Sequence, residues 1–110
     1  MRKILYNKCY GGFGFSDELL AMFGIYKEEG YSRRAQYTQA GAAFCDNIDN
    51  RVKPEVIASV ERMGLEAASG ECSKLAIYEA DDDEIVSISN HDGYETVHVV
   101  CRARNGFVID

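Results

Sequence analysis

The sequence predicts an α+β fold, in which an antiparallel sheet of about four strands carries two helices on one face. Three observations predict it. Period-two alternation occurs near the N-terminus and again in the last third of the chain, two segments between them show helical spacing, and turn signals separate the final strands. The expected order is β-α-α-β-β-β. At 110 residues, 46% of them apolar, the chain is expected to form one domain, residues 1–110.

A glycine-rich loop is expected to separate the first strand from the first helix. The segment RKILYNKCY predicts the strand, and its alternation separates Ile4, Tyr6 and Lys8 from Leu5, Asn7 and Cys9. Ser16 is the expected N-cap of the helix, because Asp17 and Glu18 then occupy the first turn, where the helix dipole favours acids. Gly30 is the expected stop, and the apolar stripe is Leu19, Leu20, Met22, Phe23 and Tyr26.

The middle of the chain is expected to be a long connection followed by a helix and three strands. Residues 31–50 show no sustained period, apart from a short strand expected at Ala35–Thr38. The second helix begins at Pro54, since the first helical position tolerates a missing N–H, and ends at Gly64. The strands are expected at Lys74–Glu79, Glu84–Ser89 and Tyr94–Ala103, joined by an aspartate turn and by the hairpin turn Asn90–Gly93.

Composition and charge limit the classes of function. No run approaches the roughly 20 apolar residues of a membrane helix, and no signal peptide is visible, so a cytoplasmic protein is expected. The net charge of -6 is concentrated in residues 54–110, which disfavours direct nucleic-acid binding and suits a basic partner. The scattered cysteines predict reduced thiols rather than a disulfide framework or a zinc site; they are Cys9, Cys45, Cys72 and Cys101.

The glycine loop has the local order of a phosphate-binding site, a strand followed by glycines and a helix N-terminus. The dinucleotide fingerprint needs a third glycine where Asp17 stands, and a P-loop needs a lysine where Phe15 stands. Asp17 and Glu18 would also repel an anion. A structural turn is therefore favoured, formed by Gly11, Gly12, Gly14 and Ser16. The alternative is a small-ligand site or enzyme pocket lined by Asn7, Tyr10 and the Gly11–Gly14 backbone.

No catalytic or metal-binding constellation is evident in the sequence. His98 could form a nucleophilic pair with Cys9 or Cys101, but nothing in the sequence brings them together, and His91 lies in a turn. The acidic run after residue 80 lacks the D-x-[DN]-x-[DN]-G spacing of a calcium loop. We therefore predict a protein that is not an enzyme, with no catalytic residue, no cofactor and no metal.

Two features predict a surface that binds a partner. The acidic run forms either a solvated turn or a contact with a basic partner, because spaced carboxylates can imitate the charges of a nucleic-acid backbone; it consists of Asp81, Asp82, Asp83 and Glu84. Loop aromatics either pack beneath the long connection or complete the binding surface, since aromatic residues are enriched at interfaces; they are Phe13, Phe15, Tyr31 and Tyr37.

The opening NKCYGGFGFSDE, Asn7–Glu18, resembles a family of small uncharacterised proteins encoded by bacteriophages, prophages and some other viruses, whose N-termini carry the motif N-K-C-Y-G-G-F-G-[LF]-S. Looser similarity continues in Pro54–Gly70 and in Lys74–Arg102. The chain departs from the family pattern at Lys53, Ala80 and Cys101. The resemblance implies a phage or mobile-element setting, and no particular activity.

These observations together predict a non-enzymatic, phage-borne binding protein in the host cytoplasm. It would inhibit a host macromolecule, as an anti-defence or anti-CRISPR-like protein that masks a basic nucleic-acid-binding surface, without contacting nucleic acid or membrane. Its partner would be a host protein or protein–nucleic-acid complex. The alternative function is the small-ligand-binding protein or enzyme built on Gly11–Gly14.

Overall fold

The computed structural model describes residues 2–26, 38–81, 84–101 and 106–109. It confirms the α+β class. The elements in chain order are β1 (Arg2–Asn7), α1 (Asp17–Met22), α2 (Gln39–Asp46), the 3-10 helix η2 (Ile48–Arg51), α3 (Pro54–Met63), α4 (Leu65–Ala68), β2 (Leu75–Ala80), β3 (Ile85–His91), β4 (Tyr94–Cys101) and β5 (Gly106–Ile109). No helix within the described ranges has the length and apolar character needed to cross a bilayer.

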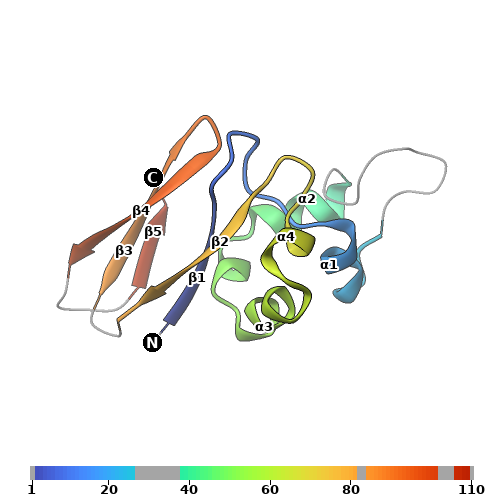
Figure 1. The fold of residues 1–110 in the computed structure, drawn as a ribbon, viewed down its shortest axis with the longest axis horizontal. Coiled ribbons are helices and arrows are strands. Elements are labelled where there is room, and N and C mark those ends of the chain that lie inside the picture. Colours follow the sequence, from blue (N-terminus) through green and yellow to red (C-terminus); the bar gives the residue numbers. More distant parts are fainter. Residues whose placement is uncertain (1, 27–37, 82–83, 102–105, 110) are drawn as a thin grey trace.

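The prediction of a single four-stranded sheet with two helices was wrong, because the strands form two sheets and the described residues contain four α-helices and a 3-10 helix. β1 and β2 pair antiparallel as a two-stranded ribbon, while the second sheet has the order β4-β3-β5. β3 pairs antiparallel with β4 and parallel with β5, a strand that the sequence did not predict. The helices lie on one side of the β1–β2 ribbon and the three-stranded sheet on the other (Figure 1).

β1 is buried on both faces, and this explains the layered arrangement. Leu5 belongs to a core cluster shared with the helices, whereas Ile4 packs with Val86 and Ile88 of the second sheet. Both side chains are fully buried. An amphipathic strand would leave one face to water, but β1 is covered on both faces, by the helices and by the second sheet.

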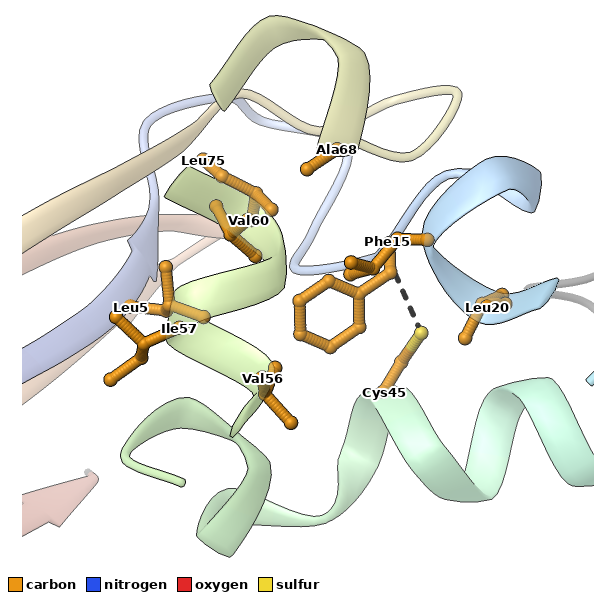
Figure 2. Close-up of a cluster of buried hydrophobic side chains, with 10 residues drawn as sticks. Leu5, Phe15, Leu20, Cys45, Val56, Ile57, Val60, Ala68 and Leu75 are labelled. Atoms are coloured by element: carbon orange, nitrogen blue, oxygen red, sulfur yellow. Dashed lines mark hydrogen bonds between the residues drawn. The ribbon is translucent and has the colours of Figure 1, made fainter. Parts of the chain in front are cut away.

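The helical side of the core is centred on Phe15 (Figure 2). Its ring lies among side chains from four helices and both strands of the ribbon, and its N–H donates to Cys45 Sγ at 3.4 Å. The buried members of this cluster are Leu5, Phe15, Leu19, Leu20, Cys45, Val56, Ile57, Val60, Ala68 and Leu75. Removing a buried ring of this kind destabilises a protein by about 3–5 kcal/mol, so Phe15 is a structural residue.

The helix caps and the hairpin turn lie at the residues that the sequence predicted. Ser16 caps α1 by accepting from the Leu19 N–H, Pro54 occupies the first turn of α3, and Gly64 ends α3 with φ of 99°. The β3–β4 hairpin turns at Asp92 and Gly93, whose φ angles of 53° and 90° are the positive pair that a two-residue type I′ turn requires.

Two boundaries differ from the prediction. α1 ends at Met22, before Gly24 with φ of 79°, instead of continuing to Gly30. Gln39–Asp46 and Ile48–Arg51 are helical rather than irregular, and Thr38 caps α2 by accepting from the Gly41 N–H. Thr38 therefore starts a helix instead of ending the expected strand, whose other residues lie outside the described ranges.

Candidate functional site at the glycine loop

A buried ion pair lies beneath the glycine loop. Glu95 of β4 is 1% exposed, and its two carboxylate oxygens accept from Nη1 and Nη2 of Arg51 at 2.7 and 2.9 Å. The Asn7 backbone N–H donates to the same carboxylate at 2.8 Å. A buried carboxylate is tolerated when paired and hydrogen-bonded in this way. The pair therefore joins η2, β1 and β4 at one point.

The guanidinium of Arg51 also fixes the glycine loop. Its Cζ lies 3.9 Å from the centroid of the Phe13 ring, which is a cation–π geometry. Phe13 in turn meets the ring of Phe15 edge-on, with centroids 5.1 Å apart. The loop is thus anchored from below by a cation and a core aromatic ring.

Asn7 holds three chain segments together with its fully buried side chain. Its Nδ2 donates to Cys9 O at 2.6 Å and to Gly93 O at 2.8 Å, and its Oδ1 accepts from the Lys74 N–H at 2.8 Å. These acceptors and the donor belong to the glycine loop, the β3–β4 hairpin turn and the start of β2. The three segments therefore meet at one end of the β1–β2 ribbon, which Figure 1 shows at the top.

Close backbone approaches explain two glycines at this end. A Cβ at Gly11 would lie 2.1 Å from Cys72 Cβ, and a Cβ at Gly93 would lie 2.5 Å from Tyr10 O and 2.6 Å from Gly12 N. Gly12 has φ of 93°, and its carbonyl accepts from Ser73 Oγ at 2.8 Å. The chain itself therefore packs against the loop backbone at the positions where a phosphate site would offer N–H groups.

An aromatic pair lies at the same end, with the Tyr10 ring exposed and the Tyr94 ring partly buried. The Tyr10 ring is 67% exposed and lies 5.1 Å from the Tyr94 ring, centroid to centroid, at an interplanar angle of 40°. Beside it, His91 Nε2 and Asp92 Oδ2 are 3.8 Å apart on exposed side chains. We call Tyr10, Tyr94 and Asp92 the loop-end surface.

Those expected contact residues that the structure describes do not form one surface. Phe15 is 0% exposed and Glu84 is 4% exposed, so neither side chain is available to a partner in this fold. Phe13 is half-buried against Arg51. Tyr31, Tyr37, Asp82 and Asp83 lie outside the described residues.

Asp81 and Glu84, the described residues of the acidic run, lie at the opposite end of the ribbon and are joined to each other and to Arg2. Glu84 Oε1 accepts from the Asp81 N–H at 2.7 Å, and Arg2 Nη2 donates to the carbonyl oxygens of Asp81 and Glu84. The pairing of Arg2 with Ala80 and of Asn7 with Leu75 puts the length of β1, about 17 Å, between these residues and the glycine loop. Asp81 and the glycine loop therefore cannot act as one small contact patch.

The buried thiol of Cys45 and the imidazole of His98 occupy separate parts of the fold. Burial raises the pKa of the Cys45 thiol, a nearby Asp46 raises it further, and the Phe15 N–H opposes both effects. Cys45 lies in the helical core, whereas exposed His98 lies on β4 with Nε2 3.2 Å from Thr96 Oγ1. Within the described ranges, no group of three or more His, Cys, Asp or Glu side chains is arranged to hold a metal ion.

Arg51 and Glu95 are the important residues that the sequence interpretation missed. Glu95 lies two residues before Val97 on β4 and therefore on the same face of the strand, and Val97 packs on the inner face of the sheet. A charged residue at an apolar position of a strand indicates a buried partner, and this signal was available. Nothing local identified Arg51 as that partner.

The fold and the site define a small α+β protein with a glycine loop that is packed against its own chain and an exposed tyrosine, Tyr10, at the loop end. A scan against protein-family models finds no match, and searches of curated proteins and of solved structures find none either. The resemblance of Asn7–Glu18 to phage-encoded proteins stays a prediction.

Proposed function

We propose that this protein is a non-enzymatic binding protein of phage or mobile-element origin, which inhibits a host macromolecule by masking a basic nucleic-acid-binding surface. The target class is a nucleic-acid-handling defence complex, such as a CRISPR effector. The observation that carries this proposal is the excess of exposed carboxylates. The resemblance of the N-terminal motif supplies the setting.

Among the described residues, the exposed Asp and Glu side chains outnumber the exposed Lys and Arg side chains. The exposed acids are Glu18, Asp46, Asp49, Glu55, Glu61, Glu66, Glu71, Glu79, Asp81 and Asp92. The exposed Lys and Arg residues are Lys8, Lys53, Arg62 and Lys74. Such a surface attracts a cationic groove and repels the phosphate backbone that the groove normally binds.

The packing of the glycine loop weighs against the alternative, a small-ligand or enzymatic site. Gly11 is in contact with Cys72, and Gly93 approaches Tyr10 O and Gly12 N. The buried carboxylate of Glu95 is neutralised by Arg51, so it serves the fold. A binding protein needs no pocket at this position.

Inhibition would be electrostatic and steric. At physiological salt the Debye length is about 8 Å, so only carboxylates close to the target surface contribute. Inhibition should therefore weaken as salt rises, and it should depend on where the acids lie. This dependence separates a docked complex from unspecific attraction by net charge.

The test adds the purified protein to a panel of purified CRISPR effector complexes and measures target-DNA binding by gel shift at low and high salt. The proposal expects DNA binding by at least one effector to be lost stoichiometrically, with less inhibition at high salt. Unchanged DNA binding across the panel would contradict the anti-defence function.

A pair of charge-matched variants locates the acids that matter. One variant is Asp81→Asn, Asp82→Asn and Asp83→Asn, which leaves the capping carboxylate of Glu84 in place. The control neutralises three acids of the helical side: Asp46→Asn, Glu55→Gln and Glu66→Gln. A larger loss of inhibition in the first variant supports contact through the acidic turn, and equal losses contradict it.

A further inference from the structure

The Tyr10 side chain is exposed at a place where the backbone is firmly held. Tyr10 O and Gly12 N lie against Gly93, while the Asn7 amide joins Cys9 O to Gly93 O. Ser73 Oγ holds Gly12 O from the β2 side. A large exposed ring on a rigid backbone needs little further ordering when it binds, which favours affinity.

The chemistry of the loop-end surface is aromatic and anionic. The exposed Tyr10 ring and the partly buried Tyr94 ring lie at 40° to one another, and exposed Asp92 lies two residues before Tyr94 in the hairpin. Ring faces attract cations through their quadrupole, and a neighbouring carboxylate adds a hydrogen-bonding anion. Together these groups match a guanidinium, which stacks flat on a ring while its N–H groups bind a carboxylate.

Other charges at this end restrict the partner. Lys74 lies directly before β2 and Lys8 directly after β1, so the surface next to the hairpin carries charges of both signs. Mixed charges around exposed tyrosines are typical of the polar rim of a protein–protein interface. A single-stranded nucleic acid would meet Asp92 and a chain of net charge -6, which disfavours it.

We propose that Tyr10, Tyr94 and Asp92 form a docking surface for an arginine side chain of a partner protein. This inference deepens the proposed function, on which it rests, by naming the contact site and the residue type recognised. The basic surface of a nucleic-acid-binding protein offers such arginines. The site lies at the opposite end of the ribbon from Asp81, so the two surfaces are tested separately.

The experiment measures binding of two fluorescent nonapeptides of equal charge, one of arginine and one of lysine, by anisotropy. The wild-type protein is expected to bind the arginine peptide about three- to fivefold more tightly than the lysine peptide, the difference that exposed stacking contributes. Tyr10→Ala is expected to remove that preference. Asp92→Asn is expected to weaken binding of both peptides.

Tyr26→Ala is the matched control, because the Tyr26 ring is 69% exposed and follows α1 on the helical side. It should retain the full preference for arginine. Circular dichroism verifies that both tyrosine variants are folded. In the wild-type protein, NMR titration with the arginine peptide should shift the ring resonances of Tyr10 and Tyr94.

Equal affinity for the two peptides, or a preference that survives Tyr10→Ala, would overturn the proposal. The outcome is separable from the test of the proposed function. If effector inhibition persists in Tyr10→Ala, only the proposal for the loop-end surface is contradicted. If arginine binds at Tyr10 but no effector is inhibited, only the anti-defence function is contradicted.

Discussion

Breaking the buried pair of Arg51 and Glu95 should destabilise the whole molecule. Arg51→Met keeps much of the side-chain volume but removes the partner of a carboxylate that is 1% exposed. Glu95 would then keep only the Asn7 N–H as a donor among the contacts described above. Leaving one member of a buried pair uncompensated typically costs about 3–5 kcal/mol, and we expect a loss in this range.

Urea unfolding followed by circular dichroism measures the loss. At a slope of about 1.5 kcal/mol per M, the midpoint should fall by roughly 2–3 M. Arg62→Met is the control, because Arg62 is exposed in the last turn of α3 and should lose less than about 1 kcal/mol. Adding Glu95→Gln to Arg51→Met should recover about 2 kcal/mol, since the amide oxygen can still accept from Asn7 without a buried charge.

Similar small losses in Arg51→Met and Arg62→Met would refute this reasoning, because they would mean that Glu95 reaches water when its partner is removed. A double variant no more stable than Arg51→Met would refute the assignment of the loss to the unpaired charge. Lost packing against Phe13 would then be the larger effect.

Two further predictions concern the glycine loop and the core. Gly93→Ala places a Cβ 2.5 Å from a carbonyl oxygen at φ of 90°, and it should lower the free energy of unfolding by about 3 kcal/mol or more. Gly24→Ala, at φ of 79° with open space around the Cβ, is the control and should lower it by about 1–2 kcal/mol. Equal losses in urea unfolding would show that the close approach is absent. Burial raises the pKa of Cys45, so its neutral thiol contributes stability that is present below the unfolded pKa and is lost as pH rises through the folded one. Urea midpoints between pH 7 and 10 should therefore fall more steeply in the wild type than in Cys45→Ala, and the same slope in both would contradict it.

The elements that the sequence predicted well carry their signals within a few residues. Pro54 and Gly64 bracket α3, Ser16 starts α1, and Asp92–Gly93 is the turn of a β-hairpin. Each of these signals acts through a local φ preference or a side-chain cap, which requires no knowledge of the remainder of the fold.

The failures concern tertiary relations. The separation of the strands into two sheets depends on β1 being covered on both faces, by Leu5 contacts on one side and Ile4 contacts on the other. Because both residues are apolar, the pattern of β1 fits one sheet and two sheets equally well, and it cannot distinguish the two topologies. α2 was missed because its cap, Thr38, follows a segment without periodicity and because its residues are small rather than amphipathic.

The candidate site was half predictable for the same reason. The glycine loop was recognisable as a structural turn, yet the residues that immobilise it come from η2, β2 and the hairpin, far away in sequence. Burial of Phe15 was equally hidden, because a loop aromatic next to a glycine has the same local pattern whether it faces solvent or the core. Only the pairing of distant segments decides between these cases.

The buried polar cluster gives the glycine loop its specific position, and the loop in turn positions Tyr10. Hydrophobic burial alone is nondirectional, whereas the two bonds between Arg51 and Glu95 and the three contacts of the Asn7 amide each require a defined geometry. If the loop-end surface binds a partner, weakening this cluster should lower affinity without touching the contact itself. Gly93→Ala therefore tests whether the position of the loop matters for binding. It should reduce the preference for the arginine peptide although Tyr10, Tyr94 and Asp92 are unchanged.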